Sequence, residues 1–434
     1  MANTTEEIKS KLDIVDVIEG YIKTERAGSN VKARCPFHNE KTASFFVSPE
    51  RQTYHCFGCN RGGDMFSFVE EIEGLDFRGA LKILAEKAGV SLGNFSPKEK
   101  SDKDEVFEVL ESATIFFQQN LEQKESAQKY LLDRGLTKET IEEFRIGFAL
   151  NDWRALSVHL QEKGYANPVL EKAGMVKRSE KGYYDRFRGR VMFPISDTSG
   201  RVVGFSGRIL PEFEKEEGVA KYINNPETVA YDKSKVLYGF DKAKMAVRKT
   251  GKCVIVEGQM DLIMSHQAGV INSVAVSGTA LTEKHLSAIK RLAGKLIFAF
   301  DADKAGIAAA RKGFNNALAL GIEVRIVNLP KGADPAEIIN EDKEEWKKKI
   351  SSSVHIIDFL IKVLDDSALK SREYGIQISK VILPYVKALD SSIEQGYFIK
   401  TIAEKLKMDE APLWEELKKT KELTSEKQSD DSVV

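Results

Sequence analysis

Two short pairs of metal-ligand residues constrain the N-terminal part of the chain more than any other feature of the sequence. Cys35 and His38 are separated by two residues, and seventeen residues later Cys56 and Cys59 repeat that spacing. A gap of two residues lets one tight turn present both ligands, and zinc takes four such ligands in a tetrahedron. A closed set of four predicts one structural Zn²⁺ with no open position for catalysis. The alternative is three buried free cysteines and a surface histidine.

The residues between the two pairs favour a β-hairpin that brings the pairs together. Its expected strands are 42–47 and 51–55, with a turn at 48–50. Strand alternation turns His55 away from the face of Cys56, so we do not expect His55 to be a ligand. The fourth cysteine, Cys253, starts an apolar strand and is expected only to pack.

Aromatic and basic side chains are interleaved with the zinc ligands. A cationic sheet that carries aromatics suits single-stranded nucleic acid, because bases stack and phosphates pair with cations. The alternative is that the aromatics form the core of the ribbon, which we expect for Phe45 and Phe57. The basic candidates for binding are Arg34, Lys41 and Arg51.

Composition indicates a folded protein with local basic patches. The 434 residues are 42% hydrophobic and 30% charged, which excludes wholesale disorder, and four cysteines do not make a disulfide framework. No apolar run approaches the roughly 20 residues that span a bilayer, and the start lacks a signal-peptide pattern, so we expect a cytoplasmic protein. The net charge is −1, yet residues 21–61 carry seven basic against three acidic residues, and residues 177–208 carry eight against three. Such islands are typical of a protein that contacts phosphate at defined places.

The chain divides into four expected blocks. Residues 1–90 hold the ribbon between helices, the first of them amphipathic through Ile8, Leu12, Val15 and Ile18. Polar residues 91–105 form a linker. Residues 106–250 read as helices and then short strands, residues 251–340 as alternating strands and helices, residues 341–420 as charged helices, and residues 421–434 as a polar tail. Strands alternating with helices predict a parallel sheet, so the fold class is α/β and α+β with several domains.

Carboxylates follow the strands of the predicted parallel sheet. Glu257 and Asp261 come after the first strand, Asp301 and Asp303 after the third, and Asp334 after the fourth. The carboxyl ends of parallel strands meet at one edge, where ligands bind in open α/β sheets. Oxygen ligands suit Mg²⁺, with Mn²⁺ as the alternative ion. The other interpretation is helix N-capping, which explains any one aspartate but not Glu257 together with an Asp-x-Asp on another strand.

These motifs together resemble a known family. Glu257-Gly258 with Asp301-x-Asp303 is similar to a Toprim domain. The chain as a whole resembles the bacterial DnaG-type DNA primases over about residues 5–400. The segments that carry this resemblance, besides the zinc ribbon that precedes them, are residues 185–195, 204–208, 221–228 and 237–239. The resemblance implies a CHC2 zinc-ribbon domain at 1–90, the N-terminal basic subdomain of a polymerase core at 106–250, a Toprim subdomain at 251–340 and a helical subdomain at 341–420.

The resemblance also implies an activity, partners and residue roles. The activity is synthesis of short RNA primers on a single-stranded DNA template from ribonucleoside triphosphates, giving an RNA–DNA hybrid at replication forks on the nucleoid, together with a replicative helicase. Glu257, Asp301 and Asp303 would be catalytic and bind Mg²⁺, with Asp261 and Asp334 in support. The positions implied to contact nucleic acid or nucleotide are Arg186, Arg188, Arg208, Lys221, Asn225 and Lys233.

The chain departs from the family pattern at three places. Ala336 stands where the family commonly has an aspartate, and Gln259 where an aromatic is usual. We also find no evident C-terminal helicase-binding domain. The alternative functions are a Toprim nuclease, a type IA topoisomerase, and a zinc DNA-binding protein with vestigial acids. A helicase fusion would need a Walker A motif, which the sequence lacks.

Overall fold

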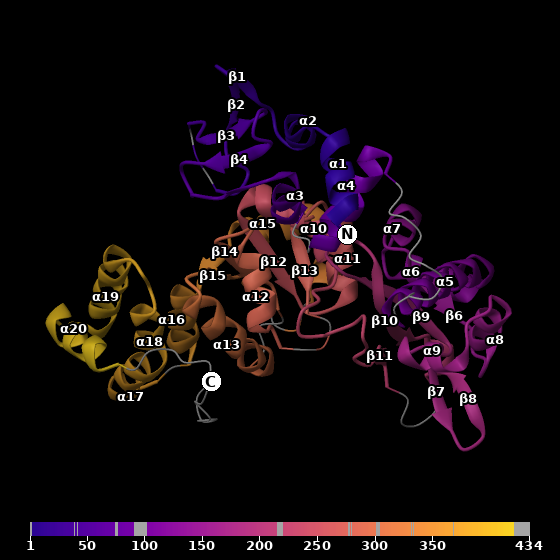
Figure 1. The fold of residues 1–434 in the computed structure, drawn as a ribbon. Coiled ribbons are helices and arrows are strands. Elements are labelled where there is room, and N and C mark those ends of the chain that lie inside the picture. Colours follow the sequence, from indigo (N-terminus) through magenta and orange to yellow (C-terminus); the bar gives the residue numbers. More distant parts are fainter. Residues whose placement is uncertain are drawn as a thin grey trace.

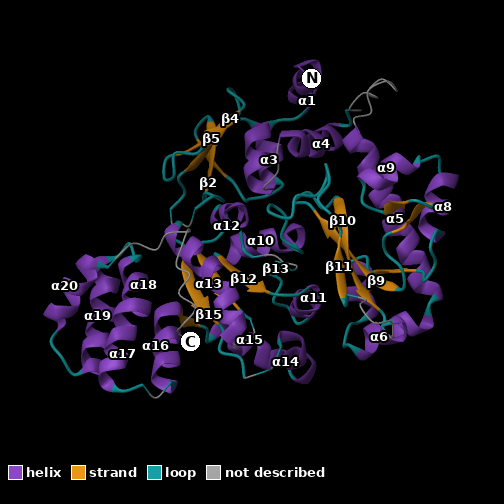
Figure 2. Ribbon diagram, turned by 90° about the horizontal axis from the view of Figure 1, so that it is seen from below, coloured by secondary structure: helices purple, strands orange, loops and turns teal. Residues whose placement is uncertain are grey.

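The computed structural model describes residues 2–38, 40, 42–73, 77–90, 102–214, 220–276, 278, 280–300, 304–330, 332, 334–367 and 369–420. In Figure 1 the N-terminal block (indigo) lies over a central sheet, with an antiparallel sheet on one side and a group of C-terminal helices (yellow) on the other. Figure 2 shows the same separation of the helical group from the antiparallel sheet. No described helix combines the length and the apolar character that crossing a membrane requires.

The N-terminal block is a small antiparallel sheet flanked by helices. The strands pair in the order β1-β2-β3-β4-β5, and β3 and β4 form the hairpin expected from the sequence. The single amphipathic helix predicted at the start is wrong: Asp13 accepts a hydrogen bond from the N–H of Val15 at 2.7 Å, which caps a second helix and breaks the first. The elements are α1 (Ala2–Lys11), α2 (Ile14–Glu19), β1 (Glu25–Ala27), β2 (Asn30–Ala33), β3 (Phe45–Ser48), β4 (Thr53–Cys56), β5 (Gly62–Gly63), α3 (Met65–Glu73) and α4 (Phe77–Ala88).

This block has a hydrophobic core of its own. Phe45, Tyr54 and Phe68 pack ring against ring inside it, and the cluster contains no residue beyond Val90. Asp64 caps α3, since its carboxylate accepts from the N–H of Ser67 at 3.0 Å. A separate core implies that the block folds around its own side chains and its metal.

The second block is built on an antiparallel sheet with the order β11-β10-β9-β6, and β7 and β8 form a separate hairpin. The helices followed by short strands that the sequence predicts for this block are confirmed. The elements are α5 (Asp102–Gln123), α6 (Glu125–Asp133), α7 (Lys138–Glu143), β6 (Gly147–Ala149), α8 (Ala155–Glu162), α9 (Asn167–Lys172), β7 (Val176–Ser179), β8 (Gly182–Asp185), β9 (Arg190–Ser196), β10 (Val202–Ile209), a 3₁₀ turn η1 (Pro211–Phe213), β11 (Tyr222–Asn224) and α10 (Phe240–Thr250).

The strand register gathers basic residues at one end of this sheet. Arg190, at the start of β9, lies opposite both Ala149 at the end of β6 and Ile209 at the end of β10. Arg208 lies opposite Tyr222 at the start of β11. The loops that leave these strand ends therefore lie together.

The third block contains the predicted parallel sheet. Its order is β13-β12-β14-β15-β16, with the first four strands parallel and β16 antiparallel at the edge. All four predicted strands are confirmed. The elements are β12 (Lys252–Val256), α11 (Gln259–Gln267), β13 (Ser273–Ala275), α12 (Glu283–Lys290), β14 (Lys295–Phe298), α13 (Lys304–Ala319), β15 (Glu323–Ile326), α14 (Pro335–Glu341), α15 (Lys343–Ser351) and β16 (Val354–His355).

The strand order creates a switch point between β12 and β14. The chain passes from β12 to β13 in one direction and then crosses to β14 in the other. Because such crossovers are right-handed, α11 and α13 lie on opposite faces of the sheet. β12 and β14 thus lead to helices on opposite faces, and the carboxyl ends of two such strands are where open α/β sheets bind ligands.

The C-terminal block is helical, as predicted. It includes one turn of π-helix between two α-helices. The elements are α16 (Ile356–Asp366), α17 (Ser371–Gln377), the π-helix η2 (Ile378–Ile382), α18 (Leu383–Lys387), α19 (Ser392–Leu406) and α20 (Glu410–Lys419).

A polar contact joins the N-terminal block to the rest of the chain. The Nζ of Lys244, on α10, donates to the backbone carbonyl of Glu73 at 3.0 Å and to its carboxylate at 2.9 Å. It also donates to the carbonyl of Thr198 in the β9–β10 turn at 3.0 Å. Arg248, one turn further along α10, donates to the carbonyl of Glu71 at 2.7 Å. Two cations of α10 thus satisfy carbonyls at the C-terminal end of α3.

Candidate zinc, acidic and basic sites

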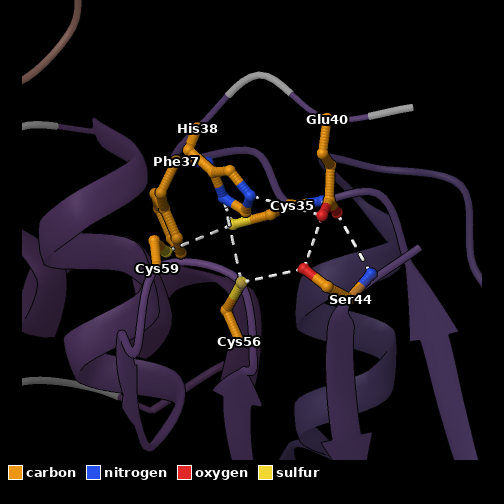
Figure 3. A network of polar contacts seen from close by, with 7 residues as sticks. All are labelled: Cys35, Phe37, His38, Glu40, Ser44, Cys56 and Cys59. Atoms are coloured by element: carbon orange, nitrogen blue, oxygen red, sulfur yellow. Dashed lines mark hydrogen bonds and ion pairs between the residues drawn. The ribbon is translucent and has the colours of Figure 1, made fainter. Parts of the chain in front are cut away.

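The four predicted zinc ligands converge. One ligand atom from each of Cys35, His38, Cys56 and Cys59 lies within 4.8 Å of the other three. The sulfurs of Cys35 and Cys59 are 3.8 Å apart, and the Cys56 sulfur is 3.8 Å from Nδ1 of His38. Ligands about 2.3 Å from one tetrahedral ion are about 3.8 Å apart, so the donor set fits zinc. Figure 3 shows the four side chains pointing at one another.

Glu40 supports this centre, and sequence reasoning missed it. Its carboxylate accepts from the backbone N–H of Cys35 at 2.6 Å and from the hydroxyl of Ser44 at 2.5 Å, and it lies 3.3 Å from Nε2 of His38 (Figure 3). Burial alone would raise the pKa of Glu40, but the hydrogen bonds from Ser44 and Cys35 outweigh it and lower that pKa. An ionised carboxylate on Nε2 leaves Nδ1 for the metal and fixes the ring.

The second ligand pair needs a glycine for steric reasons. A Cβ at Gly58 would lie 2.6 Å from Nε2 of His38. Any larger residue would push the imidazole away from the sulfurs. The spacing of this pair therefore depends on Gly58 as well as on Cys56 and Cys59.

The outer face of the ribbon sheet carries an aromatic cluster. Phe46 and His55 are cross-strand neighbours, and the ring of Phe57 contacts both, with centroids at 5.5 and 4.8 Å. The expectation that Phe57 belongs to the core is wrong, because its side chain is 73% exposed, whereas Phe45 is buried as expected. His55 points away from the ligands, as predicted. The cluster gives the ribbon a solvent-facing stacking surface.

The basic candidates of the ribbon lie on its surface. Arg34 and Arg51 are exposed, and Lys32 is the cross-strand neighbour of Phe46. Lys41 lies outside the described residues. Cations beside exposed rings are the combination that single-stranded nucleic acid favours.

The acidic edge of the parallel sheet is described in part. Glu257 is exposed directly after β12, and Asp301 and Asp303 lie outside the described residues. Asp261 accepts from the N–H of Gly258 at 3.1 Å, and Asp334 caps α14 by accepting from the N–H of Glu337 at 2.7 Å. The capping interpretation thus applies to both of these aspartates.

The described carboxylates are electrostatically coupled. Burial raises the pKa of Asp261 to about 7, and the neighbouring carboxylates of Asp334 and Glu257 add to the rise. Among the described residues, the zinc set alone brings three or more His, Cys, Asp or Glu side chains within reach of one ion. A magnesium site at this edge therefore needs carboxylates beyond Glu257, Asp261 and Asp334.

Arg208 is the most firmly held of the predicted basic residues. Its guanidinium donates to the hydroxyl of Tyr222 at 2.8 Å and lies over the rings of Tyr222 and Tyr130, at 5.2 and 5.4 Å from their centroids. Arg190, in contrast, is buried, and its guanidinium donates hydrogen bonds to the carbonyls of Gly207 and Ala220. The sheet end thus has one structural arginine and one held by two tyrosines.

The remaining predicted residues differ in exposure. Lys221 is exposed immediately before β11, and Lys233 is half-buried. Asn225 is completely buried and donates to the carbonyl of Ala173 at 3.0 Å, which is a structural contact. A nucleotide cannot reach that side chain in this conformation.

Three segments of the chain match models of known domains. The matches are a CHC2 zinc finger at residues 1–100, the N-terminal domain of a DNA primase catalytic core at 116–244, and a Toprim-like domain at 254–339. A zinc ribbon joined to an acidic Toprim-type sheet defines the class: a zinc-containing Toprim protein.

Whole-chain comparisons narrow that class. The DNA primase of Clostridium acetobutylicum is 37% identical over 417 residues, covering 94% of this chain and 69% of that protein. The zinc-binding and RNA polymerase domains of Aquifex aeolicus primase superpose with a TM-score of 0.64 at 32% identity, covering 95% of this chain and 98% of that one. A DnaG primase catalytic domain bound to single-stranded DNA superposes with a TM-score of 0.62 at 30% identity, covering 72% of this chain and 99% of that one. The chain belongs to the bacterial DnaG-type DNA primase family, whose members are enzymes that make RNA primers.

Proposed function

We propose that the chain is a DNA-templated RNA polymerase that joins ribonucleoside triphosphates into primers on single-stranded DNA. The reaction is attack of a 3′-hydroxyl on an α-phosphorus, with departure of pyrophosphate. Phosphoryl transfer asks a protein mainly for alignment and charge neutralisation. The observation that carries the proposal is the switch point between β12 and β14, where Glu257 follows one strand and the Asp301-x-Asp303 motif follows the other.

The proposed metal ligands are Glu257, Asp301 and Asp303, and Asp261 and Asp334 support them. When bound, Mg²⁺ supplies charge stabilisation for the attacking and leaving oxygens. Glu257 is exposed at the end of its strand, where substrate can reach it. Asp261 and Asp334 fix the starts of α11 and α14, so their role is to hold the loops on that side of the sheet.

The proposed strand contacts lie on the ribbon and at the basic end of the second sheet. The cluster of Phe46, His55 and the exposed Phe57 suits stacking of template bases. Arg208, held by two tyrosines, is oriented to bind phosphate without further loss of rotamer freedom. The DNA-bound relative supports the same class of partner for this chain. In this proposal residues 1–90, 106–250, 251–340 and 341–420 act as separate functional units.

The test is primer synthesis on single-stranded template with four ribonucleotides and Mg²⁺, resolved on a denaturing gel. Glu257→Gln should lower product formation at least about 100-fold, on the order of losing one transition-state-stabilising group. Glu323→Gln is the matched control, because it makes the same change at the opposite edge of the same sheet. Cleavage of the template instead of primer synthesis, or equal activity of the two variants, would overturn the proposal.

A further inference from the structure

An exposed tryptophan stands beside the basic residues of the second block. The side chain of Trp153 is 62% exposed, although it follows a strand of a well-packed sheet. The guanidinium of Arg188 lies 4.0 Å from the centroid of its ring, and the ring of Tyr184 meets it edge-on at 5.5 Å. A large ring with a cation on it and ample solvent exposure is the arrangement that stacks on an unpaired base.

The loop that carries Trp153 is held by hydrogen bonds to the buried residue Asp185. The carbonyl of Trp153 accepts the N–H of Asp185 at 2.8 Å, and the buried carboxylate of Asp185 accepts from the N–H groups of Leu156 and Ser157 at 2.7 and 3.0 Å. Arg188 in turn donates to the carbonyl of Asp185. Trp153 and Arg188 are thus both hydrogen-bonded to Asp185, so binding should cost little conformational entropy at this site.

The cations around this ring have no carboxylate partner among the residues that the structure describes. Within the described residues, Lys177, Arg186 and Arg188 form no ion pair. Two acids lie between them in sequence: Glu180 is in the turn of the β7–β8 hairpin, and Asp185 points inward to cap α8. Burial and the charges of Arg186 and Arg188 lower the pKa of Lys177, so these three groups lie close enough to repel one another. Unneutralised cations in a cluster favour an anion, and phosphate is one that a nucleic acid supplies repeatedly.

The register connects this cluster with the rest of the basic end of the sheet. Trp153 follows β6, Arg188 precedes β9, Arg208 lies near the end of β10, and Lys221 precedes β11. All four leave the sheet at the same end, as the register of Arg190 requires. A nucleic-acid strand that crosses that end of the sheet would therefore pass both the ring and these cations.

We propose that Trp153, backed by Arg188, is a stacking platform for an unpaired base of the template, and that Lys177 and Arg186 bind the adjoining phosphates. The inference rests on the proposed function, because it assumes that the partner is a single-stranded nucleic acid. The proposal places a template-binding site on the second block, separate from the acidic edge of the parallel sheet.

Intrinsic fluorescence tests the stacking directly. Trp346 is completely buried, so in Trp414→Phe the full-length chain has one exposed tryptophan, Trp153. Binding of an oligothymidylate without Mg²⁺ should quench its emission, because a stacked base contacts the ring. Unchanged emission at saturating oligothymidylate would overturn the proposal.

Binding affinity separates the ring from the cations. Trp153→Ala should weaken oligothymidylate binding about 5- to 150-fold, the loss for one base–aromatic stack, while Trp153→Phe should retain most of it. Tyr397→Ala, a ring of the same 62% exposure on α19, should bind like wild type. Arg186→Gln should reduce the slope of log K against log salt by about 0.7, and Trp153→Ala should leave that slope unchanged.

The outcomes distinguish this inference from the proposed function. A wild-type chain that primes, together with a Trp153→Ala variant that binds and primes like Tyr397→Ala, would overturn the platform alone. A wild-type chain that shows the expected quenching but makes no primer would overturn the proposed polymerase and leave the platform standing.

Discussion

Lys244→Met should release the N-terminal block from the rest of the chain without unfolding it. Lys244 is only 12% exposed and saturates its three donors on Glu73 and Thr198 at 2.9 to 3.0 Å. Hydrogen bonds to a charged group contribute about 1.5–3 kcal/mol each when buried. Two of these three hydrogen bonds join Lys244 to Glu73 of the N-terminal block. Because the side chain of Glu73 is 20% exposed, we take the lower value for each bond. The variant should therefore lose about 3 kcal/mol of docking free energy, or roughly 100-fold in the equilibrium constant for docking of the N-terminal block.

Hydrogen exchange measured by mass spectrometry is the assay. In Lys244→Met, peptides from the end of α3 and from α10 should exchange faster, while the β3–β4 hairpin should stay protected because its core is separate. Lys242→Met, two residues earlier on α10, is the control, since its cation pairs with Glu143 and not with the N-terminal block. Unchanged exchange at α3, or loss of protection in β3 and β4 as well, would refute the reasoning.

Three further predictions concern the zinc centre, the ribbon surface and pH. Glu40→Gln should weaken zinc binding about 10- to 100-fold in a chelator competition, as loss of an outer-shell carboxylate does, and undiminished affinity would contradict its assigned role. Phe57→Ala should weaken binding of single-stranded DNA yet leave the melting temperature within error, whereas Phe45→Ala should cost about 3–5 kcal/mol of stability; a ribbon destabilised equally by both would argue against a solvent-facing Phe57. Burial lowers the pKa of His266 and His285 below 6.5, so the unfolded chain takes up their protons first, and these two residues should destabilise the fold as pH drops below about 6.5; in denaturant melts, a variant with glutamine at both positions should lose less stability over that range than the wild-type chain.

Motif spacing predicted the zinc centre and the parallel sheet because both depend on local patterns. Two ligand pairs and four apolar strands are visible in the sequence without knowledge of distant contacts. The first helix failed for a local reason too: the apolar spacing continues through Leu12, but Asp13 competes by capping a new helix. Periodicity alone does not register that competition.

Other features depend on contacts between distant residues, which a single sequence does not reveal. Phe57 follows a strand closely enough to look like core, yet the ligand turn points it outward. Asn225 resembles a binding residue until its burial against Ala173 is known. Glu40 could have been suspected, since a carboxylate two residues after a histidine ligand is within reach of its ring.

The separate core of the N-terminal block also affects how the chain responds to heat. A block that holds together through its own rings and its own ion can melt by itself, so calorimetry should record more than one transition, and no single melting temperature will characterise the whole polypeptide. Adding a chelator should shift the transition of that block and leave the others where they were.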